Sequence, residues 1–138
     1  MFAGLGEPLL RLDSLCEALK LLGAATRDTC GRGILVAGTR LNTNGVCKQS
    51  SAVCENWSAG LVPRAEADVV ASRLADSGLT ACCVQVQTAD PVQYGQLVGP
   101  SDGLTLDDAK ALVSALLERG IDVECSVIGR PEVGQCAK

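Results

Sequence analysis

The sequence contains no histidine and is poor in aromatic residues, with one Phe, one Trp and one Tyr among 138 residues. Without histidine, the chain lacks the side chain most often used for proton transfer near neutral pH and the commonest metal ligand. Hydrophobic residues nevertheless make up 47% of the sequence, so the interior must consist of Leu, Val, Ala and Cys. An apolar content this high in a small chain indicates that some of it faces a partner.

Basic residues are also scarce, because 12 Lys and Arg stand against 16 Asp and Glu, for a net charge of -4. A protein that binds a phosphate backbone needs clustered Lys and Arg, so nucleic acid is excluded as a partner. No apolar run approaches the roughly 20 residues of a membrane span. Glu7 precedes any basic residue, and the N-terminus has no uninterrupted apolar segment, which argues against a secretory signal. We therefore expect a protein made in the cytoplasm without a signal peptide and without a membrane partner.

Catalytic motifs are missing too. The sequence has no Gly-x-Ser-x-Gly elbow, no glycine-rich phosphate loop and no acid pair at a recognisable spacing. Gly31 and Gly33 precede a predicted strand, whereas a dinucleotide fingerprint follows one. A cysteine nucleophile would lack a histidine base. These observations predict a protein that is not an enzyme and needs no cofactor.

Cysteine, by contrast, is abundant. The eight cysteines are Cys16, Cys30, Cys47, Cys54, Cys82, Cys83, Cys125 and Cys136. Because no Cys-x-x-Cys pair and no histidine accompanies them, we expect no metal site. Two uses stay open: buried thiols that act as small hydrophobic groups, and disulfides, which are typical of exported or extracellular proteins.

Two segments read as copies of one another. Residues 57–63 (WSAGLVP) align with 94–100 (YGQLVGP), and each is followed by a helical pattern, a glycine and a short apolar strand. Neither copy alone can bury its apolar side, so the duplication predicts one sheet with its helices on one face. The expected fold is α+β, with a four-stranded antiparallel sheet in βαββαβ order, ferredoxin-like, over residues 57–129. Residues 1–56 form an N-terminal helix and β-hairpin extension, and 130–138 a C-terminal tail.

Local patterns predict the individual elements. A helix is expected over 14–22 with a capping box at Ser14 and Glu17, a strand over 33–39, and a turn over 42–45 that returns through Val46 and Cys47. Further helices are expected over 64–76, with Val69, Val70 and Leu74 inward, and from the Thr105–Asp108 cap to Gly120, with Ala109, Leu112, Val113 and Leu116 inward.

Strand alternation assigns faces to the central cysteines. Val123, Cys125 and Val127 alternate with polar residues, so Cys125 is expected beneath the helices, with Cys83 in the same place in the first copy. Cys82 then points to the open face. The two strands are expected on opposite edges of the sheet, roughly 14 Å apart, so Cys83 and Cys125 should not be bonded.

The order of elements, with Leu-Val before Pro in both copies, resembles a SPOR domain over residues 57–129. Residues 94–100 look like the third strand of that family and the turn that follows it. The resemblance implies binding of peptidoglycan glycan strands by the open sheet face, with Trp57, Ala59, Tyr94 and Gln96 as the matching positions. The first copy departs from the family at Ala59 and Gly60, where a polar residue would be expected. From the residues alone, the alternative is that Trp57 and Tyr94 close the edge of a core short of aromatics.

Two functions follow. The first is a structural protein of an extracellular assembly, such as a decoration or linking protein of a bacteriophage virion, since the chain is similar in character to disulfide-reinforced virion proteins. Its partners would be other subunits of that assembly or a second copy, joined through Cys16, Cys30, Cys47, Cys54, Cys82 or Cys136. Cys47 and Cys54 could instead close an internal bridge worth roughly 2 to 3 kcal/mol, and Cys136 is best placed to reach a neighbour. The alternative is a glycan-binding SPOR-like module in the cell envelope or periplasm.

Overall fold

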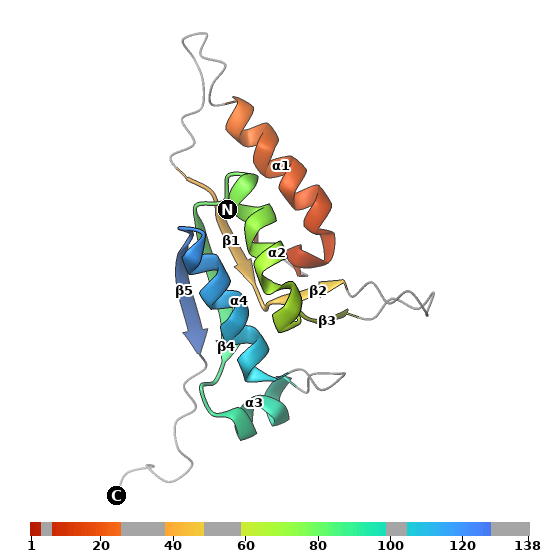
Figure 1. Cartoon of the computed structure of the whole chain (residues 1–138), viewed down its shortest axis with the longest axis vertical. Helices are drawn as coiled ribbons and strands as arrows, with labels where there is room; N and C mark the ends of the chain where they lie inside the picture. The colour runs from red at the N-terminus through yellow and green to blue at the C-terminus, as the bar shows by residue number, and fades with distance from the viewer. Residues whose placement is uncertain (4–6, 26–37, 49–58, 99–104, 128–138) are drawn as a thin grey trace, which may run out of the picture.

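The computed structural model describes residues 1–3, 7–25, 38–48, 59–98 and 105–127 (Figure 1). Its elements in chain order are η1 (Pro8–Arg11), α1 (Leu12–Ala25), β1 (Arg40–Thr43), β2 (Val46–Lys48), β3 (Ala59–Leu61), α2 (Arg64–Asp76), β4 (Ala81–Gln87), α3 (Pro91–Val98), α4 (Leu106–Glu118) and β5 (Asp122–Val127). The helices predicted over 64–76 and after Thr105 are confirmed, and the first helix is longer than predicted.

The central sheet has three strands in the order β1-β4-β5, and all of them are parallel. The predicted α+β fold with a four-stranded antiparallel, SPOR-like sheet is therefore wrong, although the chain does mix helices and strands. A second, two-stranded sheet pairs β2 with β3 in antiparallel fashion. Since β2 pairs with β3, the predicted hairpin that returns through Val46 and Cys47 is also wrong. Most of the strand predicted over 33–39 lies outside the described residues.

The cause of the difference is the segment expected to form the third strand. Residues 91–98 form α3, because Asp90 accepts hydrogen bonds from the N–H groups of Val92 (2.8 Å) and Gln93 (3.0 Å) and Pro91 occupies the first helical position. The described residues between β4 and α4 form this helix and no strand, so the chain crosses back over the sheet, and β5 runs parallel to β4.

The duplication survives in a reduced form as two helix-glycine-strand units. α2 leads through Gly78 to β4, and α4 leads through Gly120 to β5. Both glycines have left-handed backbone angles, with φ of 94° and 74°, which glycine adopts without steric cost. The starts of α2 and α4 are joined by Asp108, whose carboxylate accepts from the N–H groups of Thr105 (2.8 Å) and Arg64 (3.0 Å). Burial alone would raise the pKa of Asp108, but these hydrogen bonds outweigh it and lower the pKa.

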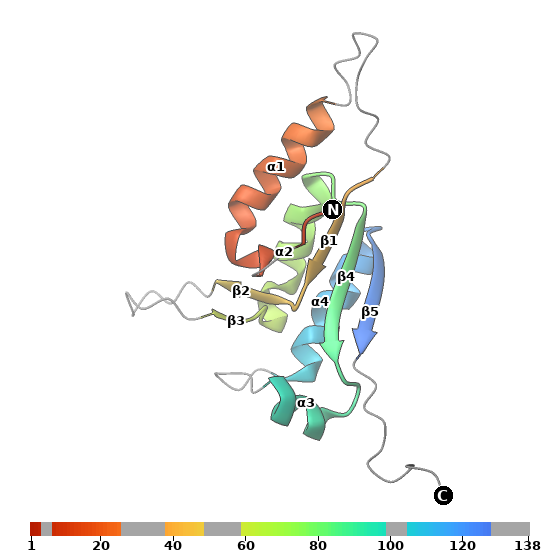
Figure 2. The same ribbon diagram turned by 180° about the vertical axis from the view of Figure 1, so that it is seen from behind.

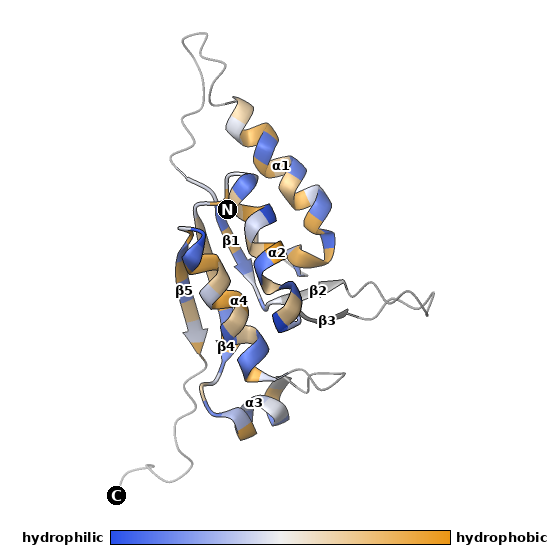
Figure 3. Cartoon of the chain, in the orientation of Figure 1, coloured by the Kyte–Doolittle hydropathy of each residue, from blue (hydrophilic) through white to orange (hydrophobic). Residues whose placement is uncertain are grey.

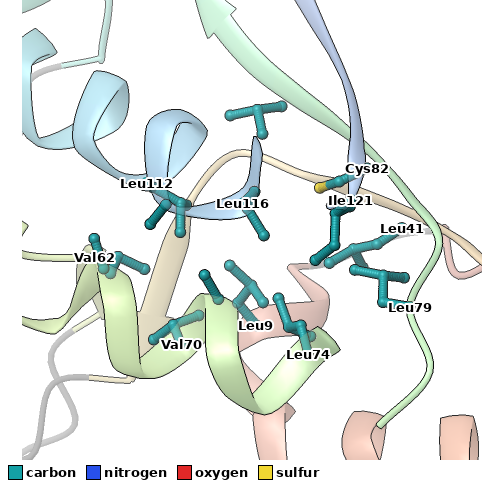
Figure 4. Close-up of a cluster of buried hydrophobic side chains, with 14 of the residues drawn as sticks. Leu9, Leu41, Val62, Val70, Leu74, Leu79, Cys82, Leu112, Leu116 and Ile121 are labelled. Carbon is teal, nitrogen blue, oxygen red and sulfur yellow. The ribbon is translucent and has the colours of Figure 1, made fainter. Parts of the chain in front are cut away.

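The core lies between the sheet and the layer formed by α2 and α4, and it consists largely of Leu, Val, Ala and Cys, as predicted (Figure 4). Hydrophobic and hydrophilic residues alternate around α1 and α4 (Figure 3), as expected for helices with one apolar face. Leu9, Leu19 and Leu41, from the predicted extension, share this core with residues of α2 and α4. One inward prediction is wrong, since Val69 is exposed, whereas Val113 is half-buried and packs against the core.

The N-terminal residues add to the sheet at the side of β1. Phe2 forms a parallel bridge with Leu41, in which the Phe2 N–H donates to the Arg40 carbonyl (2.7 Å) and the Asn42 N–H donates to the Phe2 carbonyl (3.0 Å). The outer side of β1 is therefore paired with another part of the same chain.

Candidate functional site

One face of the parallel sheet carries no helix among the described elements. Figure 2 shows the strands in front, with α2 and α4 on the far side. We call this the open face; the side chains that alternation places on it are Arg40, Asn42, Ala81, Cys83, Gln85, Asp122, Glu124 and Ser126. Parallel sheets usually have both faces covered. A polar open face is therefore a candidate surface for a partner.

An ion pair crosses the middle of the open face. The Arg40 guanidinium, from β1, donates to the Glu124 carboxylate, from β5, and so spans the central strand β4. Hydrogen bonding to Glu124 raises the pKa of Arg40, and the same bond lowers the pKa of Glu124. Both side chains are exposed, so solvent screens the pair and it contributes little to stability.

Cys82 and Cys83 face opposite sides of the sheet, and the predicted assignment is inverted. Cys82 is 1% exposed and lies in the core beside Leu116 and Ile121 (Figure 4), whereas Cys83 is half-buried on the open face. Burial raises the pKa of Cys82 to about 12. The signal that could have given the correct face is the run after the cysteines, where Val84 and Val86 alternate with Gln85 and Gln87.

Cys125 was expected beneath the helices, but its side chain is exposed. It lies on the helix-facing side of β5, in register with Val84, but β5 is an edge strand and Cys125 is not covered. The pKa of Cys125 is raised, mainly by partial burial of the thiol and to a smaller extent by the neighbouring Cys83. Cys83 and Cys125 are both free thiols. The sequence predicts no bond between them because their strands would lie on opposite edges of the sheet. That reason is wrong, because β4 and β5 are adjacent strands.

The other predicted site residues are scattered. Tyr94 lies in α3 and is 2% exposed, Gln96 lies exposed on the same helix, and Ala59 is in β3. Cys16 is a buried free thiol, and Cys47 is in β2 opposite Gly60. Trp57, Cys30, Cys54 and Cys136 lie outside the described residues. The structure therefore does not bring Tyr94 and Gln96 onto the open face.

A shallow groove of about 470 Å³ runs between α2 and α4. Its lining includes Ala67, Ala111 and Ala115, and charged residues stand around them. Several of these charges pair with neighbours, since Lys110 binds Asp107 (3.1 Å) and Asp68 binds Arg119. The groove is therefore lined by small apolar residues and by charged residues, several of which pair with a neighbour.

In the fully reduced native protein at low concentration, we expect the thiols to differ sharply in reactivity with a maleimide reagent. Cys125 should be labelled fastest and Cys83 more slowly, whereas Cys82 and Cys16 should react only through opening of the core. For a domain stability of at least about 5 kcal/mol, global opening slows labelling by roughly a thousandfold or more. Peptide mapping by mass spectrometry over a time course measures this order. Equal rates at Cys82 and Cys125 would contradict the register of β4.

None of the helices in the described ranges has the length and hydrophobicity of a bilayer span. The same residues contain no group of three or more Cys, Asp or Glu side chains that could hold a metal ion. No protein-family model, curated protein or solved structure matches the chain.

Proposed function

We propose that the protein is a non-enzymatic structural subunit of an extracellular assembly, such as a bacteriophage virion, in which subunits are linked through cysteines. The observation that carries the proposal is Cys125, a free thiol exposed on the edge strand of a sheet with an open face. A virion protein is made in the host cytoplasm without a signal and then works in oxidising surroundings, where disulfides persist.

The surroundings of Cys125 support a linking role. A regular strand in a parallel ladder holds the thiol in a defined position, and two packed helices support that ladder from behind. The open face adds a polar surface with charges of both signs, Arg40 and Glu124. Cys82, by contrast, is 1% exposed in the core, so its thiol is not accessible to a neighbouring subunit.

The glycan-binding alternative has less support from the fold. It requires an aromatic side chain at the sheet surface, and Tyr94 is buried within α3 instead. Gln96, the polar residue named with it, lies on a helix. No observation on the open face favours a sugar over a protein partner.

Electrophoresis of the full chain, purified from oxidising surroundings, tests the proposal. Without reductant we expect a covalent dimer from the wild-type protein and from Cys83→Ser, and its loss in Cys125→Ser. Cys83→Ser is the matched control because Cys83 lies on the adjacent strand but is not at the edge. A single monomer band without reductant in all three samples would refute the structural role.

A further inference from the structure

The outer edge of β5 is unpaired within the part of the chain that the structure describes. Among the strands that the structure describes, β5 pairs with β4 alone, and five of the six residues of β5 are exposed. Figures 1 and 2 both show β5 at the outside of the sheet, opposite the side of β1. Such an edge presents a row of N–H and C=O groups that can bind a further strand.

The direction of the backbone amides shows which residues are available for this pairing. The Asp122 N–H donates to the Thr80 carbonyl (3.0 Å), so the amide of Asp122 faces β4. Because the amides of a strand alternate in direction, those of Val123, Cys125 and Val127 face outward.

The same edge also exposes apolar side chains. Val123, Cys125 and Val127 lie on the helix-facing side of β5, and Val127 is 60% exposed. In α4, the side that turns away from the groove with α2 carries the half-buried Val113 and Leu117, which is 54% exposed. We call these five residues the edge patch. Natural edge strands are usually protected by Lys, Pro or inward-pointing charge, and the two charged residues of β5, Asp122 and Glu124, lie on the open face.

We propose that β5 pairs antiparallel with β5 of a second copy of this chain, about a twofold axis at Cys125. This joins two three-stranded sheets into one continuous sheet with all helices on one side. The inference rests on the proposed function, a subunit linked through cysteines, and names its partner as a second copy.

Charge and side-chain pattern select this register. With the axis at Cys125, Val123 lies opposite Val127 of the second copy, and Glu124 lies opposite Ser126. An axis at Glu124 would place two glutamates opposite each other, and like charges in that position are destabilising. An axis at Ser126 would leave only residues 125–127 of β5 paired. The chosen register pairs residues 123–127 and covers the edge patch.

The register also brings the two Cys125 residues together. Directly opposite residues that exchange hydrogen bonds have Cα atoms about 5.5 Å apart, within the Cα range of disulfides, and their Cβ atoms, up to about 5.5 Å apart, must move roughly 1 Å closer for the S–S bond to form. With oxidised glutathione as oxidant, one Cys125 thiolate attacks its disulfide, forms a mixed disulfide and releases one glutathione thiolate. The second Cys125 thiolate then attacks the sulfur of the first Cys125 and releases the other glutathione, so two protein thiols are oxidised and one glutathione disulfide is reduced.

The pairing is tested first without any disulfide, by light scattering of the full chain during size-exclusion chromatography in reducing buffer. We expect a dimer in the wild type and in Cys125→Ser. In Ser126→Glu, the new glutamate of each copy lies opposite Glu124 of the other, so the dimer gains two pairs of like charges and should weaken roughly 2- to 30-fold. Ser126→Lys forms two pairs of opposite charges instead and should tighten the dimer by a similar factor. Gln96→Glu and Gln96→Lys are the matched controls, since they change net charge equally on α3, and should leave the dimer unchanged.

Oxidation then tests the register. After treatment of the reduced chain with oxidised glutathione, peptide mapping should show Cys125 linked to Cys125 of the second copy. A reduced monomer at all concentrations, or equal dimerisation of Ser126→Glu and Ser126→Lys, would refute the pairing. The two proposals fail separately: a reduced monomer beside a covalent dimer in native material removes only the β5 pairing, whereas a reduced dimer without a covalent dimer removes only the cysteine-linked assembly.

Discussion

Replacing Leu116 by Ala is expected to lower the free energy of unfolding by about 2 to 5 kcal/mol. Leu116 is 1% exposed and fills the space between the sheet and α2, so its truncation removes apolar contacts and leaves a cavity (Figure 4). The total stability of a domain is typically about 5 to 15 kcal/mol, so this single change could remove a large share of it. Urea denaturation followed by circular dichroism measures the loss through the transition midpoint.

Leu117→Ala is the matched control, because it makes the same truncation one residue further along α4 at a side chain that is largely exposed. Its expected effect is within about 0.5 kcal/mol when measured in reducing buffer at low protein concentration. Similar losses for both variants would mean that α4 is rotated about its axis relative to the structure described.

Replacing Tyr94 by Ala is expected to cost about 3 to 5 kcal/mol, the range for buried aromatic side chains. The ring belongs to the core cluster, and burial raises the pKa of its hydroxyl. Thermal or urea unfolding monitored by circular dichroism gives the size of the effect.

The comparison with Gln96→Ala is decisive for the role of α3. Gln96 lies exposed two residues further along the same helix, so its truncation should leave stability within about 0.5 kcal/mol of wild type. If Tyr94→Ala were as stable as Gln96→Ala, the ring would be at a surface, as the predicted third strand required.

The parts of the fold that the sequence predicted are those encoded locally. The helix over Arg64–Asp76 and the capping box at Thr105 follow from helical periodicity and from side-chain hydrogen bonds within a few residues. Gly78 and Gly120, which lie between a helix and the next strand, are also predictable from the residue type, since glycine readily takes a left-handed backbone angle.

The direction of the strands depends on a short segment, residues 94–100, that the sequence predicts as a strand and most of which lies in α3. Residues 94–100 were matched to residues 57–63 by similarity, whereas Asp90 and Pro91 just before them are a helix start signal. Once α3 replaces a strand, β5 returns parallel and beside β4. The predicted strand order depends on that one assignment. The predicted faces of Cys82, Cys83 and Cys125 depend on which residues of each strand point toward the helices.

The candidate site was therefore only partly predictable. The abundance of cysteine directed attention to the thiols, but which of them reaches solvent depends on strand order, which is a property of the whole sheet. Cys125 is exposed because β5, among the described strands, has a neighbour on one side only. No local pattern in residues 121–127 distinguishes an edge strand from a covered one, since apolar and polar residues alternate in both.

The bridge between Phe2 and Leu41 has a consequence for stoichiometry. Since Phe2 of the same chain already bonds to the outer side of β1, the part of the sheet that the structure describes has one free edge for strand addition, that of β5. When two molecules pair through this edge, neither has a free edge left, so assembly by strand addition ends at a closed dimer and does not continue into a fibre. Larger particles would then have to be built from such pairs through other surfaces.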